Sequence, residues 1–374
     1  MPAISLAPAL SFLNVFTRMS PAQPLQTFIR ATDYKLRPPR PVPFTPTIRK
    51  RQESVLLSGI AGVHQASNIL YEKRKGASPT IVLGGFIPDA TEQVFLLRGF
   101  LLKHGSVYYI NYPRHGFSNE MLFAQLEDLV EELAETHGQL PMIFSVSFGV
   151  GLVMEWLKRA RREGRQIELR GLVLVSPVAC VEDLLAPGEA KPTTLLGRAI
   201  KPYVDPNKRA DEQTVAKSRA IFTKMYESGA QNKESLRVLM TRGELRQLHE
   251  AVTATIQTIS ADGACERVQA LRHLEPPSSY FSQILLPLTK APTLILYAEK
   301  ESSVIADHSP TRFALETARQ AYFPESQYRI ITNHRGSPVQ HASLIFHYFN
   351  FLPVIADFYR KVKNAKAQPA LASR

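Results

Sequence analysis

One serine stands where a strand is expected to turn sharply into a helix. Ser147 lies in the stretch Phe-Ser-Val-Ser-Phe-Gly at residues 144–149. A tight strand-to-helix bend lifts a serine hydroxyl clear of the sheet, and the small residues Ser145 and Gly149 leave room for the strained backbone. The N–H groups at the start of the following helix would stabilise a developing negative charge. The pattern predicts a nucleophilic serine, and the alternative is a serine that only caps the helix.

Alternating strands and helices are expected to position this serine. Continuous apolar runs predict strands buried on both faces, and apolar residues at helical spacing predict the helices between them. The predicted strands are 54–58, 66–72, 80–84, 107–112, 141–146, 172–176, 293–297 and 328–332. The predicted helices are 93–104, 120–137, 148–163, 311–322 and 341–363. This alternation predicts an α/β fold with a mainly parallel sheet that is covered by helices.

A block of helices interrupts the alternation. Residues 180–286 have almost no strand pattern, whereas three segments have helical spacing: 211–228, 233–260 and 265–274. We expect an inserted, all-helical lid over the carboxyl edge of the sheet, where open α/β sheets bind ligands. The predicted parts are a Pro-rich basic N-terminal arm (1–52), a core (53–179 and 287–365), the helical lid (180–286) and a basic C-terminal tail (366–374).

The order of elements and the stretch around Ser147 resemble the α/β-hydrolase superfamily. The resemblance covers roughly residues 54–178 and 290–360, and the helical block lies where members of this family often carry a lid. The family pattern is Gly-x-Ser-x-Gly, whereas Ser145 stands here in place of the first glycine. The resemblance implies a serine hydrolase in which the nucleophile, the acid and the histidine follow one another in that chain order.

The resemblance also implies the acid and the base. It places the acid just after the strand that follows the lid, which indicates Glu301, and the base after the last strand, which indicates His341. Glu301 would hold the imidazole in one tautomer, and His341 would accept the proton of Ser147. Other candidates stay open: Glu299, Asp307 and Asp183 for the acid, and His334 for the base.

Two backbone donors are implied for the oxyanion hole. Gly84 and Gly85 follow the predicted strand 80–84, at the point where the family carries a His-Gly dipeptide. By resemblance, the donors are the backbone N–H groups of Phe86 and Phe148. The alternative is a simple turn made by the two glycines.

The net charge belongs to the two ends of the chain. The 374 residues carry 45 Lys and Arg against 33 Asp and Glu, a formal net charge of +12. Residues 1–52 contribute +7 and residues 360–374 contribute +5, so the body between them is neutral. Because nucleic-acid-binding domains carry their basic patch on a folded face, nucleic acid is not expected as a partner. The arm is interpreted as a flexible tail, as a segment that docks on its own body or on a second subunit of a homo-oligomer, or as a peripheral membrane contact.

Composition further narrows the class of protein. Cys180 and Cys265 are too few for a disulfide framework or a structural zinc site. No apolar run reaches the roughly 18 residues of a membrane span, and no positive residue precedes the apolar N-terminal stretch as in a secretory signal. We expect no metal, no cofactor and a cytoplasmic protein.

The expected function is hydrolysis of a small-molecule ester or thioester through an acyl-enzyme on Ser147. Apolar faces on the predicted lid helices, with Leu248, Val252 and Ile256, favour an apolar acyl or alcohol part of the substrate under the lid. Three alternatives stay open: an acyltransferase with the same triad, a carbon–carbon bond hydrolase, and a non-catalytic ligand-binding protein.

Overall fold

A mainly parallel sheet lies at the centre of the structure. The computed structural model describes residues 41–364, except 75–77, 187–190, 206, 208–209, 231–235, 237–238 and 335. Within these residues the strand order is β1-β2-β4-β3-β5-β6-β7-β8. β2 pairs antiparallel with β1 and β4, and the other neighbours are parallel. The strands are β1 Val42–Pro43, β2 Asn68–Glu72, β3 Thr80–Leu83, β4 Val107–Asn111, β5 Met142–Val146, β6 Gly171–Val175, β7 Thr293–Ala298 and β8 Ser326–Ile331.

Successive strand residues point to opposite faces of the sheet, and helices cover both faces. Ile81 and Leu83 belong to one apolar cluster, and Val82 between them belongs to the other. The first cluster includes α6 (Asn119–His137), α7 (Phe148–Arg162), α14 (Pro310–Thr317) and α15 (Arg319–Tyr322). The second includes α4 (Ala90–Gln93), α5 (Arg98–Leu101) and α16 (Tyr348–Asn364). The predicted α/β class and the helix-covered sheet are confirmed.

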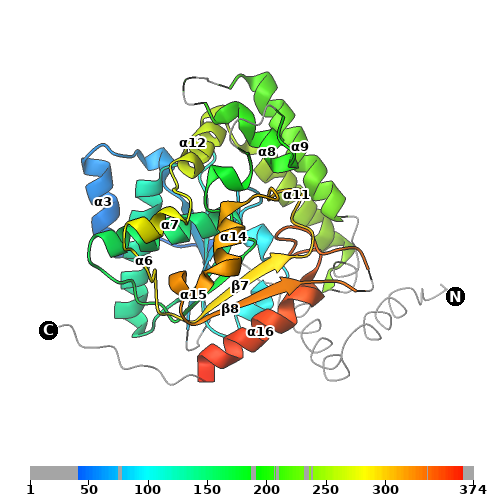
Figure 1. Cartoon of the computed structure of the whole chain (residues 1–374). Coiled ribbons are helices and arrows are strands. Elements are labelled where there is room, and N and C mark those ends of the chain that lie inside the picture. Colours follow the sequence, from blue (N-terminus) through cyan, green and yellow to red (C-terminus); the bar gives the residue numbers. More distant parts are fainter. Residues whose placement is uncertain are drawn as a thin grey trace.

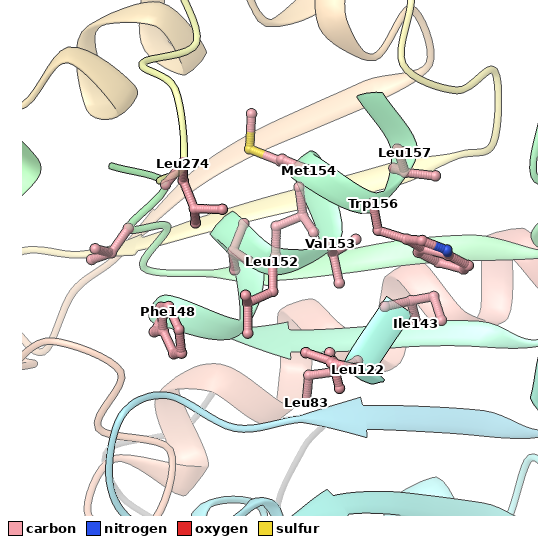
Figure 2. Packing of buried hydrophobic residues seen from close by; sticks show 14 of the residues in the cluster. Leu83, Leu122, Ile143, Phe148, Leu152, Val153, Met154, Trp156, Leu157 and Leu274 are labelled. Atoms are coloured by element: carbon pink, nitrogen blue, oxygen red, sulfur yellow. The ribbon is translucent and has the colours of Figure 1, made fainter. Parts of the chain in front are cut away.

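Helix α7 fixes the serine to the core. Figure 2 shows its side chains, Leu152 and Trp156 among them, packed with Leu83 and Ile143 of the sheet and Leu122 of α6. These residues are all buried, so the apolar face of α7 is held against the strands. Because α7 packs on the sheet along its length, its N-terminus, where Ser147 lies, is held in place.

The segment between β6 and β7, residues 176–292, is helical wherever it has regular structure in the described residues, and we call it the insertion. Its elements are η2 Val181–Asp183, α8 Leu195–Ile200, η3 Lys201–Tyr203, α9 Glu212–Ala230, α11 Arg242–Thr258, α12 Ala261–Arg272 and α13 Ser279–Ser282. In Figure 1, α8, α9, α11 and α12 gather at the top of the molecule, on the side away from α16. The predicted helix 233–260 is interrupted: Leu236 and Leu239 are helical, whereas α11 begins only at Arg242, where Thr241 caps it in a capping box with Glu244.

The first predicted strand, 54–58, is wrong. These residues belong mostly to α3 (Lys50–Leu57). The sequence Lys-Arg-Gln-Glu favours a helix, and Arg51 pairs with Asp128 and Glu131 of α6. Residues 41–57 of the chain therefore pack on the core, with β1 paired to β2. Residues 1–40 of the predicted arm and the predicted tail 366–374 lie outside the described residues.

Three predicted helices are shorter or divided. The predicted helix 93–104 contains only Gln93, the last residue of α4, and the short α5, because the N–H of Leu97 bonds the carbonyl of Val94, three residues back, and tightens the turn between the two helices. The segment 311–322 is divided at Ala318 into α14 and α15. The helix predicted at 341–363 begins only at Tyr348, since Ala342 has a positive φ of 49° that ends helical geometry. His341 consequently lies in a loop.

No helix in the described residues has both the length and the apolar character needed to cross a membrane.

Candidate active site

Ser147 stands at a strained turn. It follows β5 directly, and its backbone angles are φ 51° and ψ −119°, outside the regions that non-glycine residues favour. Its N–H donates to the carbonyl of Val175 at 2.8 Å, which ties the turn to the end of β6. The strain is therefore held by the sheet on one side and by α7 on the other.

The space around the turn explains why the residues two positions before and two positions after Ser147 are small. A Cβ on Gly149 would lie 2.5 Å from the carbonyl oxygen of Gly84, so only glycine fits there. Ser145, which replaces the first glycine of the family pattern, is fully buried, and its hydroxyl lies 3.5 Å from the carbonyl oxygen of Val173. The added side chain is accommodated between β5 and β6, so the departure from the pattern leaves the turn intact.

The structure brings Ser147, His341 and Glu301 together. His341 Nε2 lies 2.8 Å from Ser147 Oγ, and His341 Nδ1 lies 2.5 Å from Glu301 Oε2. Glu301 follows β7, and His341 lies in the loop between β8 and α16. The side chains are 1% exposed for Glu301 and 8% for His341, so little water competes for these hydrogen bonds. With the proton on Nδ1, Nε2 is free to accept the serine proton.

Ser176 is a site residue that sequence reasoning missed. It directly follows β6 and has a positive φ of 47°. Its hydroxyl donates to Glu301 Oε1 at 2.8 Å and accepts the N–H of Ala342 at 3.1 Å. The N–H of Ala298 also donates to Oε1, at 2.6 Å. One oxygen of Glu301 is thus held in place while the other faces His341. Its position after a buried strand was the signal that could have indicated it.

The other candidate acids and the other candidate base do not take part in the contacts between Ser147, His341 and Glu301. Asp183 is buried, and its carboxylate accepts hydrogen bonds from Ala179 N, Cys180 N, Ser309 Oγ and Thr311 N. Burial raises the pKa of Asp183. Glu299 Oε1 accepts the N–H groups of Asn333 and Val339 at 2.9 and 2.8 Å, which braces the loop that carries His341. Asp307 and His334 are exposed.

The two residues predicted to supply the oxyanion donors contact one another through their side chains. The rings of Phe86 and Phe148 stack with centroids 4.3 Å apart and an interplanar angle of 11°. Gly85 N–H donates to Gln93 Oε1 at 2.8 Å, and the Tyr112 hydroxyl donates to the carbonyl of Gly84 at 2.9 Å. Among the described residues, neither Phe86 N–H nor Phe148 N–H has an acceptor. Both amides are left available to a ligand atom.

A cavity of about 180 Å³ opens on Ser147 and His341. The core contributes Phe86 and Ile87, and the insertion contributes an apolar wall: Leu195, Leu196, Phe222, Met225, Tyr226, Val252 and Ile256. Leu248 packs in the core instead. No Asp, Glu, Lys or Arg in the described part of the chain lines this cavity. In the same part, no three His, Cys, Asp or Glu side chains gather as metal ligands would.

Comparison with known proteins gives the fold. No protein-family model matches the chain, and no curated protein matches its sequence. Solved structures do match. A thermophilic esterase from Thermogutta terrifontis is 16% identical, with a TM-score of 0.52 over 87% of this chain and 99% of that one. The chain has the α/β-hydrolase fold.

Two further matches differ from each other in the reaction that their names give. An esterase from Exiguobacterium antarcticum is 15% identical with a TM-score of 0.50 and covers 79% of this chain and 98% of its own. A variant of an epoxide hydrolase from Bacillus megaterium is 10% identical with a TM-score of 0.53 and covers 79% of this chain and 97% of its own. Because one fold supports several reactions, the reaction has to be argued from the site.

Proposed function

We propose that this chain is a serine hydrolase that cleaves an ester or thioester through an acyl-enzyme on Ser147. The observation that carries the proposal is the continuous chain of contacts from Ser147 Oγ through the His341 imidazole to the Glu301 carboxylate. The esterases among the matching structures support the same class of reaction. The cavity that opens on the serine gives a substrate access to it.

In the first half of the reaction, Ser147 Oγ attacks the carbonyl carbon while His341 Nε2 takes its proton. Glu301 stabilises the imidazolium that forms. The N–H groups of Phe86 and Phe148 stabilise the oxyanion of the tetrahedral intermediate. The intermediate then collapses, His341 gives the proton to the leaving alcohol or thiol, and the acyl group remains on Ser147.

In the second half, water replaces the leaving group. His341 takes a proton from the water as its oxygen attacks the acyl carbon, and the same two amides stabilise the second oxyanion. Collapse releases the carboxylic acid and returns the proton to Ser147. Glu301 orients the imidazole and stabilises its charged form in both halves of the reaction.

The cavity favours a substrate with a neutral, apolar acyl or alcohol part. Its lining from the insertion is largely apolar, and burying a charge there without a partner would cost several kcal/mol. The insertion acts in this proposal as the lid, because its side chains line the same cavity as Ser147 and His341.

The test is hydrolysis of p-nitrophenyl esters of graded chain length by the wild type and by Ser147→Ala. The wild type should hydrolyse them, and the variant should lose activity by about 10⁴-fold or more. Equal rates for the two proteins would contradict the proposal. Adding an alcohol acceptor separates hydrolysis from acyl transfer, because a transferase forms the new ester in preference to the free acid.

A further inference from the structure

The backbone that carries one oxyanion donor is held by three side chains. Tyr112 bonds the carbonyl of Gly84, Gln93 bonds the N–H of Gly85, and Arg267 Nη1 donates to the carbonyl of Phe86 at 2.9 Å. Tyr112 and Gln93 belong to the core, whereas Arg267 belongs to α12 of the insertion, 181 residues away from Phe86. The insertion therefore reaches directly into the loop that follows β3.

Arg267 is placed as a clamp between loops. Its other terminal nitrogen, Nη2, donates to the carbonyls of Tyr112 and Pro113 at 3.2 and 2.7 Å. Its guanidinium also lies over the Tyr112 ring, 5.5 Å from the centroid. One rigid, planar group thus fixes the loop after β3 relative to the loop after β4. Tyr112 is itself bonded to Gly84, so the three groups form one connected network around Phe86.

The cost of burying this group argues for a specific role. Arg267 is 2% exposed, and among the described residues it forms no ion pair with a carboxylate. Burial lowers the pKa of the Arg267 guanidinium to about 10, which leaves it charged at neutral pH. An apolar side chain would fill this place without the desolvation penalty of a buried cation. Unlike an apolar side chain, the guanidinium fixes the direction of three backbone carbonyl groups by hydrogen bonds, those of Phe86, Tyr112 and Pro113.

We propose that Arg267 is a positioning residue for the oxyanion hole, through which the docking of the insertion sets the placement of the Phe86 amide. The inference rests on the proposed function. When the Phe86 carbonyl is released, the residue is free to rotate, and its N–H loses the direction that a preorganised oxyanion hole requires. Small displacements of such a donor reduce catalysis more than substrate binding, because the oxyanion exists only in the transition state and the intermediates.

The experiment compares Arg267→Met with Glu266→Met. Glu266 is the neighbouring residue on α12 and also ties the insertion to the core, since its Oε2 accepts Phe117 N–H at 2.6 Å and Gln65 Nε2 at 2.7 Å. Among the described residues, its hydrogen bonds do not include Phe86. The control variant therefore weakens the docking of the insertion without releasing the oxyanion donor.

The readouts are kcat and KM with a p-nitrophenyl ester, and the affinity for a trifluoromethyl ketone, whose adduct with Ser147 carries an oxyanion. Arg267→Met should lower kcat and the ketone affinity roughly 10- to 100-fold, with KM changed less than about threefold. Glu266→Met should leave all three within about threefold, although both variants unfold at lower temperature. Arg267→Lys, which keeps the charge but not the fork of donors, should lie in between and serves if the Met variant does not fold.

Wild-type kcat and ketone affinity in folded Arg267→Met or Arg267→Lys would overturn the inference and leave the proposed function standing. The same holds if Glu266→Met loses as much kcat as Arg267→Met, because general loosening of the insertion would then explain both. An inactive wild type that does not bind the ketone would overturn the proposed function and this inference together.

Discussion

At the scale of single residues, the carboxylate of Glu301 is the most tightly determined group of the site. Ser176 and the N–H of Ala298 hold one oxygen, and His341 takes the other. The amide of a glutamine would keep the shape of the side chain but place a donor or a neutral acceptor beside Nδ1. A donor there would favour the wrong tautomer of the imidazole, and a neutral acceptor would stabilise its charged form less than a carboxylate does.

We therefore predict that Glu301→Gln lowers kcat by about 10² to 10⁴-fold, with little change in KM. Glu299→Gln is the matched control, since a glutamine Oε1 can still accept the N–H groups of Asn333 and Val339 that brace the loop. Steady-state kinetics with a p-nitrophenyl ester measures both variants. A larger loss for Glu299→Gln than for Glu301→Gln would reverse the assignment of the acid.

A second prediction concerns Glu92 on α4. Burial, with the Asp89 carboxylate nearby, raises the pKa of Glu92 from 4.5 to about 7. Between these values the folded state binds more protons than the unfolded state, so the stability due to this group falls as the pH rises from about 4.5 to about 7. Glu92→Gln removes this dependence. It should raise the free energy of unfolding at pH 8 by roughly 2–3 kcal/mol and leave it nearly unchanged at pH 4.5.

Urea titrations of wild type and Glu92→Gln at the two pH values measure this difference. The same stabilisation at both pH values would mean that the carboxylate does not titrate in this range.

The sequence could indicate the residues whose place along the chain fixes their place in the sheet. Ser147, Glu301 and His341 follow different strands, and parallel strands bring their carboxyl ends to one edge. Ser176 also follows a buried strand, so the sequence could indicate its place but not its partners, and Arg267 could not be predicted in this way. Their roles depend on hydrogen bonds to a carboxylate and to backbone carbonyls that are distant in sequence. Nothing in the residue type distinguishes a buried arginine on α12 from the exposed arginines of the same chain.

At the scale of elements, the contact between the turn at Ser147 and the loop after β3 depends on Gly149. A methyl group there would lie 2.5 Å from the Gly84 carbonyl, which is itself bonded by Tyr112. A shift of either backbone would also move Phe86 or Phe148, the two proposed oxyanion donors. Gly149→Ala should lower the free energy of unfolding by roughly 1–3 kcal/mol and reduce ester hydrolysis at least about tenfold.

Gly243 offers the matched control for that change. It lies in the first turn of α11, where a Cβ would meet only Thr241 Oγ1, at 3.9 Å. Gly243→Ala should raise the free energy of unfolding by up to about 1 kcal/mol and leave activity unchanged. Thermal unfolding and ester hydrolysis of the two variants give the comparison. A harmless Gly149→Ala would mean that the turn at Ser147 is not packed as the structure describes.

The strands of the core were easier to predict than the helices. The core strands are buried on both faces, so their sequences are short apolar runs with clear ends, as at Thr80–Leu83 and Gly171–Val175. Helical spacing shows which residues face the core but not where the backbone turns. The pattern of 93–104 spans α4 and α5, and the pattern before Tyr348 includes the loop of His341. The strand predicted at 54–58 was wrong because its apolar residues lie on α3, whose residues are not buried.

At the scale of the whole molecule, residues 41–57 are tied to the folded core, although no residue of α3 is buried. Asp128 of α6 is fully buried and accepts hydrogen bonds from Arg51 and Gln52, while Glu132 accepts the N–H groups of Thr47 and Ile48. Removing residues 41–57 would break these hydrogen bonds and the ion pairs of Arg51 with Asp128 and Glu131, which lowers the stability of the core.

A chain that begins at residue 41 keeps β1 and α3 and serves as the reference. A chain that begins at residue 58 should unfold at a clearly lower temperature. Calorimetry measures the unfolding temperatures of the two truncated chains. Equal unfolding temperatures for them would show that β1 and α3 add nothing to the stability of the core.

The central claim is that Ser147 is a nucleophile activated by His341, and covalent labelling with a fluorophosphonate tests it most directly. Mass spectrometry of the intact native chain should show one adduct, peptide mapping should place it on Ser147, and Ser147→Ala should remain unlabelled. His341→Ala should label at least about 10³-fold more slowly, because the serine loses its base. A native chain that does not react, or a Ser147→Ala variant that is labelled as fast as the wild type, would contradict the account.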